Sequence, residues 1–145
     1  MRLAAALLVL PLVLAAGCAG TRPYPSEGQA NLAVRTALES GVRAKLHVHR
    51  VLADCSTEYR GSVDLDRPLV ELALPPEAQA YVVVTYDTSS FFGGSRSTSA
   101  GTLLRPRAGQ SYELSVAYRD AVYSLSLRDG AGRELPRRDL GACAR

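Results

Sequence analysis

Hydrophobic and polar residues alternate with a period of two over much of the chain after residue 31. In residues 42–49, aliphatic side chains occupy every second position, with two cations and two histidines between them. Successive side chains of a strand point to opposite faces of a sheet, so this pattern is typical of a strand with one buried face. Residues 31–39 also alternate, although helical spacing fits them as well. We favour a strand there because Ser40 and Gly41 interrupt a long helix.

Further segments downstream carry the same alternation or a run of β-branched and aromatic residues. Prolines and glycines separate them, and such residues stop a strand or turn the chain. We expect seven or eight strands and no helix in residues 31–145. This predicts an all-β domain, either a single antiparallel β-sandwich or a small barrel. The additional strands are expected at 69–74, 81–86, 101–105, 112–119 and 123–128.

The beginning of the chain differs from this body. After Met1 and Arg2, 14 residues carry no charge and are almost all aliphatic. This run is shorter than the roughly 18–20 residues of a membrane-spanning helix, and its length and flanks are those of a secretory signal peptide. Residues 15–18 read Ala-Ala-Gly-Cys. Small residues before a cysteine resemble the lipobox of bacterial lipoprotein precursors.

The resemblance implies that residues 1–17 are removed and that Cys18 carries lipid, which anchors the mature chain in a membrane. Ala15 departs from the family's preference for leucine, and cleavage by an ordinary signal peptidase stays open. Ala19 implies the outer membrane, with the domain facing the periplasm. Residues 18–30, rich in proline and glycine, are expected to form a flexible tether that spans at most roughly 40 Å.

Composition narrows the class of protein further. Removing the first 17 of the 145 residues leaves 128, enough for one compact domain. The formal net charge of +3 is far below the basic excess of a nucleic-acid-binding protein, so we expect no such partner. Besides Cys18, the chain has only Cys55 and Cys143. An even pair in an exported protein predicts a disulfide bond.

Two pairs of side chains have a spacing that metal ligands can have. His47 and His49 share one strand face, but two cations share that face, and zinc normally takes three or four protein ligands. Asp64 and Asp66 are also two residues apart, but a calcium site needs six to eight oxygen ligands. We expect solvated histidines, a solvated turn at the aspartates, and neither a metal nor another cofactor.

Catalytic motifs are missing from the sequence. It contains no G-x-S-x-G nucleophile elbow, no H-E-x-x-H zinc motif and no glycine-rich phosphate loop followed by a helix. We therefore expect a protein that is not an enzyme. A small hydrolase is the least favoured alternative.

One connecting segment stands out as a candidate contact with a partner. Residues 87–99 are mainly small and polar, and within them lie Phe91 and Phe92, the only phenylalanines of the chain. Neighbours in a strand point in opposite directions, so at least one ring is expected at an exposed hairpin tip. Exposed aromatics together with Arg96 are typical of a protein contact. The alternative is that both rings cap the core.

These features favour a membrane-anchored periplasmic lipoprotein that serves as a non-enzymatic binding or accessory module, with an unidentified envelope protein as its partner. Its architecture resembles small accessory lipoproteins of secretion machines, including the sandwich lipoprotein of type VI secretion. An alternative is a periplasmic enzyme inhibitor similar to the lipoprotein lysozyme inhibitors, which are also small disulfide-bonded β-domains. Residues 133–139 are expected to form a solvated turn before Cys143.

Overall fold

The computed structural model describes residues 22–90 and 94–143, and most of these residues are in β-strands. The one helix among them is the short 3-10 helix η1 (Leu140–Ala142), and no helix in the described ranges is long and apolar enough to cross a membrane. The strands are β1 (Leu32–Leu38), β2 (Val42–Val51), β3 (Thr57–Asp64), β4 (Leu69–Leu72), β5 (Ala80–Ser90), β6 (Gly94–Leu104), β7 (Tyr112–Arg119), β8 (Val122–Asp129) and β9 (Glu134–Leu135).

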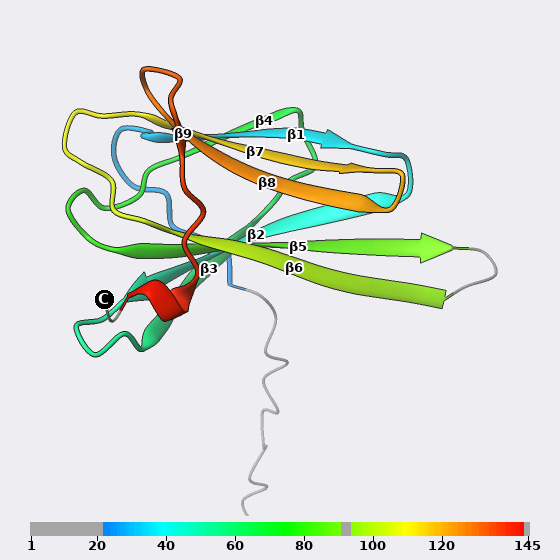
Figure 1. The fold of residues 1–145 in the computed structure, drawn as a ribbon, viewed down its shortest axis with the longest axis horizontal. Helices are drawn as coiled ribbons and strands as arrows, with labels where there is room; N and C mark the ends of the chain where they lie inside the picture. Colours follow the sequence, from blue (N-terminus) through cyan, green and yellow to red (C-terminus); the bar gives the residue numbers. More distant parts are fainter. Residues whose placement is uncertain (1–21, 91–93, 144–145) are drawn as a thin grey trace, which may run out of the picture.

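These strands form two sheets that pack face to face (Figure 1). One sheet has the order β4-β1-β7-β8-β9 and the other the order β3-β2-β5-β6. The predicted all-β sandwich is therefore confirmed. Every strand pair is antiparallel except β1 with β7. That pair can be parallel because the chain between its strands passes through both sheets, which a short hairpin could not do.

The core lies between the sheets and is made by the alternating apolar positions. Leu46 and Val48 of β2 and Leu114 and Val116 of β7 are almost completely buried. Burial of such a side chain contributes about 1.5–3 kcal/mol relative to leaving it exposed. The alternation predicted which face of each of these strands is buried, because a strand places every second side chain on the same side.

The pattern of the sequence did not reveal β3. Its first three residues are exposed, and only two residues in its middle are buried. The pairing of β3 with β2 also shifts register at a bulge, which interrupts alternation. Asp64, expected in a solvated turn, instead ends this strand and forms an ion pair with Lys45 (Oδ1 to Nζ, 3.1 Å). Asp66 lies exposed in the loop that follows.

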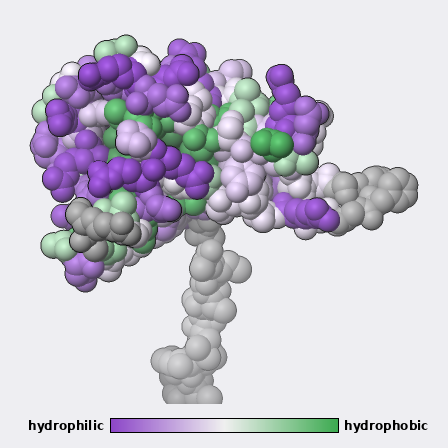
Figure 2. Space-filling view, in the orientation of Figure 1, coloured by the Kyte–Doolittle hydropathy of each residue, from purple (hydrophilic) through white to green (hydrophobic). Residues whose placement is uncertain are grey.

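The segment 87–99, expected to be a connecting loop, continues β5 and β6 as one long hairpin. Strand pairing extends as far as Ser90 and Gly94. We call residues 87–90 and 94–98 the arm. These residues project beyond the β1–β2 and β7–β8 turns, which lie at the same end of the sandwich (Figures 1 and 2). Small polar side chains suggested a loop, but backbone pairing across a hairpin does not require apolar side chains when both faces meet water.

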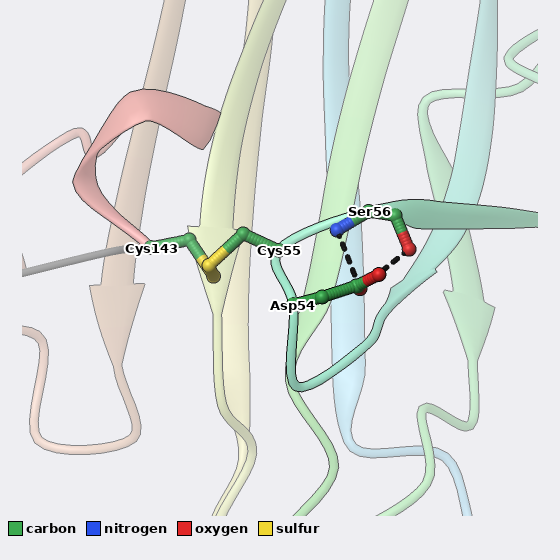
Figure 3. The surroundings of a disulfide bond; sticks show 4 residues. All are labelled: Asp54, Cys55, Ser56 and Cys143. Atoms are coloured by element: carbon green, nitrogen blue, oxygen red, sulfur yellow. Dashed lines mark hydrogen bonds between the residues drawn. A yellow bond between two sulfur atoms is a disulfide. The ribbon is translucent and has the colours of Figure 1, made fainter.

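Cys55 and Cys143 form the predicted disulfide bond, with their Cα atoms 5.8 Å apart and a sequence separation of 88 residues (Figure 3). Cys55 lies in the loop between β2 and β3. There, Asp54 Oδ1 accepts hydrogen bonds from the hydroxyl of Ser56 (2.6 Å) and from its backbone N–H (3.0 Å). These bonds lower the pKa of the Asp54 carboxyl. The disulfide thus ties the end of the chain to an ordered turn.

The C-terminal tail, expected as a solvated turn, crosses from one sheet to the edge of the other. Glu134–Leu135 pair with β8 as β9. Beyond them, the carbonyl of Arg138 accepts a hydrogen bond from the N–H of Leu103 (2.6 Å), and Arg137 Nε donates to the carbonyl of Gly101 (3.1 Å). The tail therefore covers part of the β6 edge near the disulfide.

Candidate binding cleft

Of the residues predicted to carry the membrane anchor or to contact a partner, the structure describes only Arg96. Cys18, Phe91 and Phe92 lie outside the described residues. Arg96 lies on the arm, opposite Thr88 of β5, and is exposed. The structure therefore leaves the Arg96 side chain accessible to a partner.

His47 and His49 lie on the outer face of β2, as the alternation predicted, and the ring of Tyr59 packs against both. The centroid of that ring is 6.2 Å from His47 and 5.3 Å from His49. Burial lowers the pKa of both imidazoles, and the charge of Lys45 lowers that of His47 further. Within the described ranges, no three His, Cys, Asp or Glu side chains are grouped so that they could hold a metal ion.

A cleft of about 960 Å³ opens at the end of the sandwich opposite the arm. Its walls come from the N-terminal segment (from Tyr24 to Asn31), the end of β2, Arg60 of β3, the β4–β5 loop (73–79) and the β6–β7 loop (105–111). This volume lies in the range of about 300–1,000 Å³ that is usual for ligand sites. We call this end of the molecule the cleft end and the opposite one the arm end.

The N-terminal segment forms one wall because it pairs with the edge of β3. The N–H of Tyr24 donates to the carbonyl of Ser62 (2.9 Å), and the N–H of Ser62 donates to the carbonyl of Arg22 (2.8 Å). Between them, Pro23 forms a parallel bridge to Ser62. The prediction of a flexible tether over residues 18–30 is therefore wrong from Arg22 onward, where the chain is already attached to the domain.

Three side chains fasten the rest of this segment to the β4–β5 loop. The Tyr24 hydroxyl donates to the carbonyl of Ala73, and Ser26 Oγ accepts a hydrogen bond from the N–H of Ala73 (both 2.8 Å). Asn31 bonds to both backbone groups of Leu74, again at 2.8 Å each. Burial raises the pKa of Tyr24 further above its usual range.

The loops on the opposite wall are also held in place. Glu77 has a positive φ of 61°; its N–H donates to the carbonyl of Pro106 (2.7 Å), and its carboxylate accepts from the N–H of Ala108 (3.2 Å). The Tyr112 hydroxyl accepts a hydrogen bond from the N–H of Arg107 (3.2 Å). Walls fixed in this way lose little conformational freedom when a ligand binds.

The cleft combines apolar walls with positive charge. Arg50, Arg60 and Arg107 line it, and Glu27 is the one acidic residue among its described lining residues. Arg60 is already paired with Glu58 (3.2 Å). The guanidinium groups of Arg50 and Arg107 have no hydrogen bond or ion pair with any described residue. Its apolar lining includes Pro25, Pro75, Pro76 and Ala78, together with Val48 and Leu74, which are each only 2% exposed.

The sequence alone did not predict the cleft, because its walls come from segments that are far apart along the chain. One signal was available at its start, where Tyr24 stands between Pro23 and Pro25. Proline fixes its own φ and restricts the residue before it to extended conformations. A large aromatic side chain in such a segment fits an ordered strand-like piece better than a flexible tether.

At the arm end, three tyrosines lie where the sheets end. Tyr86 is fully buried, and its hydroxyl donates to the carbonyl of Ser124 (3.0 Å). Its ring centroid is 5.5 Å from that of Tyr123 and 6.1 Å from that of Tyr118. Burial raises the pKa of Tyr86 to about 12. Tyr123 is 40% exposed and the neighbouring Val122 is 67% exposed, so this end presents some apolar surface.

Comparison with known proteins identifies the fold and not a family. No family model and no curated protein matches the chain. Among solved structures, sea bream transthyretin in complex with thyroxine matches 72% of this chain and 99% of its own chain, with a TM-score of 0.51 and 14% identity. A second transthyretin structure, from Sparus aurata, matches 70% and 99% of the two chains, with a TM-score of 0.48 and 14% identity. The first likeness shows a transthyretin-like two-sheet sandwich.

Proposed function

We propose that this chain is an exported bacterial lipoprotein, anchored in the outer membrane through Cys18, that binds another envelope protein without catalysing a reaction. The cleft would hold an acidic, extended segment of that partner. One observation carries the binding proposal: Arg50 and Arg107 stand beside apolar walls that hydrogen bonds hold in place, and neither guanidinium has a partner among the described side chains.

The disulfide between Cys55 and Cys143 supports the export part of the proposal. Disulfides persist in oxidising compartments such as the periplasm and are rare in the cytosol. The lipid part has separate support, which is the run of small residues that precedes Cys18.

The chemistry of the cleft supports an acidic ligand. A guanidinium group presents a planar fork of donors that fits a carboxylate through two parallel hydrogen bonds. Proline and alanine side chains that line the same cleft offer shallow apolar contacts that suit small apolar side chains. A peptide segment in which carboxylates alternate with such side chains would use both features at once.

Replacement of Cys18 by Ser tests the anchor. Because serine cannot take the thioether-linked lipid, we expect the variant to leave the membrane fraction and to appear in the soluble periplasmic fraction with its disulfide intact. Ala19→Ser serves as the matched control and should stay in the membrane fraction. Retention of the Cys18→Ser variant in the membrane would contradict the anchor.

A photo-crosslinking residue at Gln29, on the exposed wall of the cleft, tests the binding site in living cells. We expect an adduct with one envelope protein, and we expect the double charge reversal Arg50→Glu/Arg107→Glu to abolish it. The same residue at Glu71, on the exposed face of β4, is the control. An adduct that survives the charge reversal, or that forms equally well from Glu71, would refute the cleft as the binding site.

The arm favours one competing function, an inhibitor of a periplasmic enzyme. A two-stranded element that projects from the body (Figure 1) has a shape that can enter the active site of another protein. Assays of lysozyme inhibition with the soluble Cys18→Ser protein decide between the two functions. If the protein inhibits and loses inhibition when the arm is shortened, the inhibitor replaces the cleft-binding module as the best account.

A further inference from the structure

The chain between the proposed lipid and the folded domain is very short. Hydrogen bonds to Ser62 fix the backbone at Arg22 and Tyr24, so only residues 19–21 separate Cys18 from the first attached residue. Four residue steps span at most about 14 Å when fully extended. We infer that the edge formed by β3 and residues 22–24 lies against the phospholipid surface. This inference rests on the proposed lipidation of Cys18.

Gly61 is the residue that allows the chain to attach so early. A Cβ atom at this position would lie 2.5 Å from the Cα of Tyr24 and 2.7 Å from the carbonyl oxygen of Pro23. The φ of Gly61 is +141°, a value that other residues rarely adopt. The close pairing of residues 22–24 with β3 therefore depends on a glycine at this point.

The charges along this edge nearly balance. Arg22 and Arg60 carry positive charge, and Glu58 and Asp64 carry negative charge; Glu58 is paired with Arg60, and Asp64 with Lys45. Attraction to anionic head groups is therefore weak, and the tether itself holds the domain at the surface. The same outer sheet region exposes Leu52 (39%) and Tyr59 (36%). Tyrosine suits a membrane interface because its ring is apolar and its hydroxyl is polar.

The position of the anchor also determines how far the cleft lies from the lipid surface. The N-terminal segment that leads away from the anchor forms one wall of the cleft, beginning at Tyr24. The cleft consequently opens close to the lipid surface, where it can receive a partner's segment that lies near the membrane. The arm end lies at the other end of the strands (Figure 1).

Energy transfer to labelled lipids tests this placement, because the chain contains no tryptophan and a single introduced one is a clean donor. We would prepare the lipidated protein with Tyr59→Trp, Leu52→Trp or Tyr123→Trp, and reconstitute each in phosphatidylcholine vesicles that carry dansyl head groups. Transfer should be strong from positions 59 and 52 and several-fold weaker from position 123. Vesicles with added phosphatidylglycerol should give the same ranking.

A longer tether should weaken the transfer. Six Gly/Ser residues inserted after Gly20 add up to about 20 Å of reach, so transfer from position 59 should fall at least severalfold. Gly61→Val should have a similar effect because it expels the N-terminal segment from β3. Gly41→Val is its matched control, since Gly41 also has a positive φ but has open space around it.

The outcomes separate this inference from the proposal on which it rests. Protein that does not float with the vesicles means that lipidation, and with it the proposed anchor, has failed. Protein that floats, but transfers equally from positions 59 and 123 and is insensitive to the insertion, overturns the surface placement alone. The insertion variant leaves every described residue unchanged, so its result stands even if Gly61→Val fails to fold.

Discussion

At the cleft end of the sandwich, two pieces of chain outside the main strands are attached to the sheets, and a disulfide bond adds a third link. The N-terminal segment pairs with β3, the C-terminal tail binds the edge of β6, and the disulfide joins that tail to the β2–β3 loop. At the arm end, β5 and β6 extend from the body as a two-stranded hairpin. Among the described residues, no terminal segment and no disulfide bond attaches this hairpin to the rest of the domain.

The difference between the two ends indicates which of them is better suited to bind a partner. Segments held by many buried bonds open rarely, whereas an exposed hairpin with few packed side chains opens at low cost. A preformed cleft binds a flexible partner segment without first being ordered itself. The arm can contribute contacts, but it is held mainly by the pairing of its own two strands.

Loss of the disulfide should have the largest effect on this contrast. The double variant Cys55→Ser/Cys143→Ser removes a link across 88 residues, and the chain-entropy model then gives a loss of about 4–5 kcal/mol in the free energy of unfolding. Urea unfolding measures this loss, with the reduced wild-type protein as the control. A loss below 1 kcal/mol would mean that the stability of the cleft end does not depend on the disulfide bond.

Asn31→Ala should have the next largest effect. The variant leaves the backbone N–H and carbonyl of buried Leu74 without their partners, and such a loss costs about 1–3 kcal/mol. Arg96→Ala on the arm is the matched polar truncation, and urea unfolding should detect a change of no more than about 0.5 kcal/mol for it. Equal costs at the two sites would remove the distinction between the two ends.

Shortening the arm should change stability still less. Asp87 and Ser97 face each other in the ladder, so an Asn-Gly pair can replace residues 88–96 and close the hairpin with a two-residue turn. We expect the thermal midpoint to change by no more than a few degrees, since 1 kcal/mol corresponds to a shift of about 4–8 °C in a domain of roughly 60–100 residues and to less in a larger one. Collapse of the fold would show that the arm stabilises the body.

The smallest effect should come from the two histidines beside the cleft. Burial lowers the pKa of His47 and His49, so the unfolded chain binds protons at a higher pH than the folded one does. The contribution of the two neutral imidazoles to the free energy of unfolding is therefore fully present above their unfolded-state pKa of about 6.5. It is lost as the pH falls from there through their lower folded-state pKa values. Urea unfolding between pH 7.5 and about 5 should show this slope, and His47→Gln/His49→Gln should flatten it. An unchanged slope would assign the pH dependence to other groups.

The sequence was sufficient to predict the core and not the cleft. Alternation identifies strands such as β2 and β7, because one face of each packs on the core and the other meets water. It failed at β3, where a bulge breaks the period, and at the arm, where both faces are polar. The pairing of Arg22 and Tyr24 with Ser62 depends on residues almost forty positions apart, and no local pattern reports such a contact. The disulfide was predictable because Cys55 and Cys143 were the one pair left once Cys18 was set aside as the expected lipid site.

The most direct test of the account is to compare the two ends as binding surfaces. Lipidated wild-type protein, Arg50→Glu/Arg107→Glu and Phe91→Ser/Phe92→Ser would each be cross-linked in native membranes and isolated, and the recovered partner measured by mass spectrometry. We predict that charge reversal in the cleft lowers recovery of the principal partner at least tenfold, a change of about 1.4 kcal/mol, while the phenylalanine variant retains it. Loss of the partner only in the phenylalanine variant, with full recovery by the cleft variant, would contradict the proposed binding site.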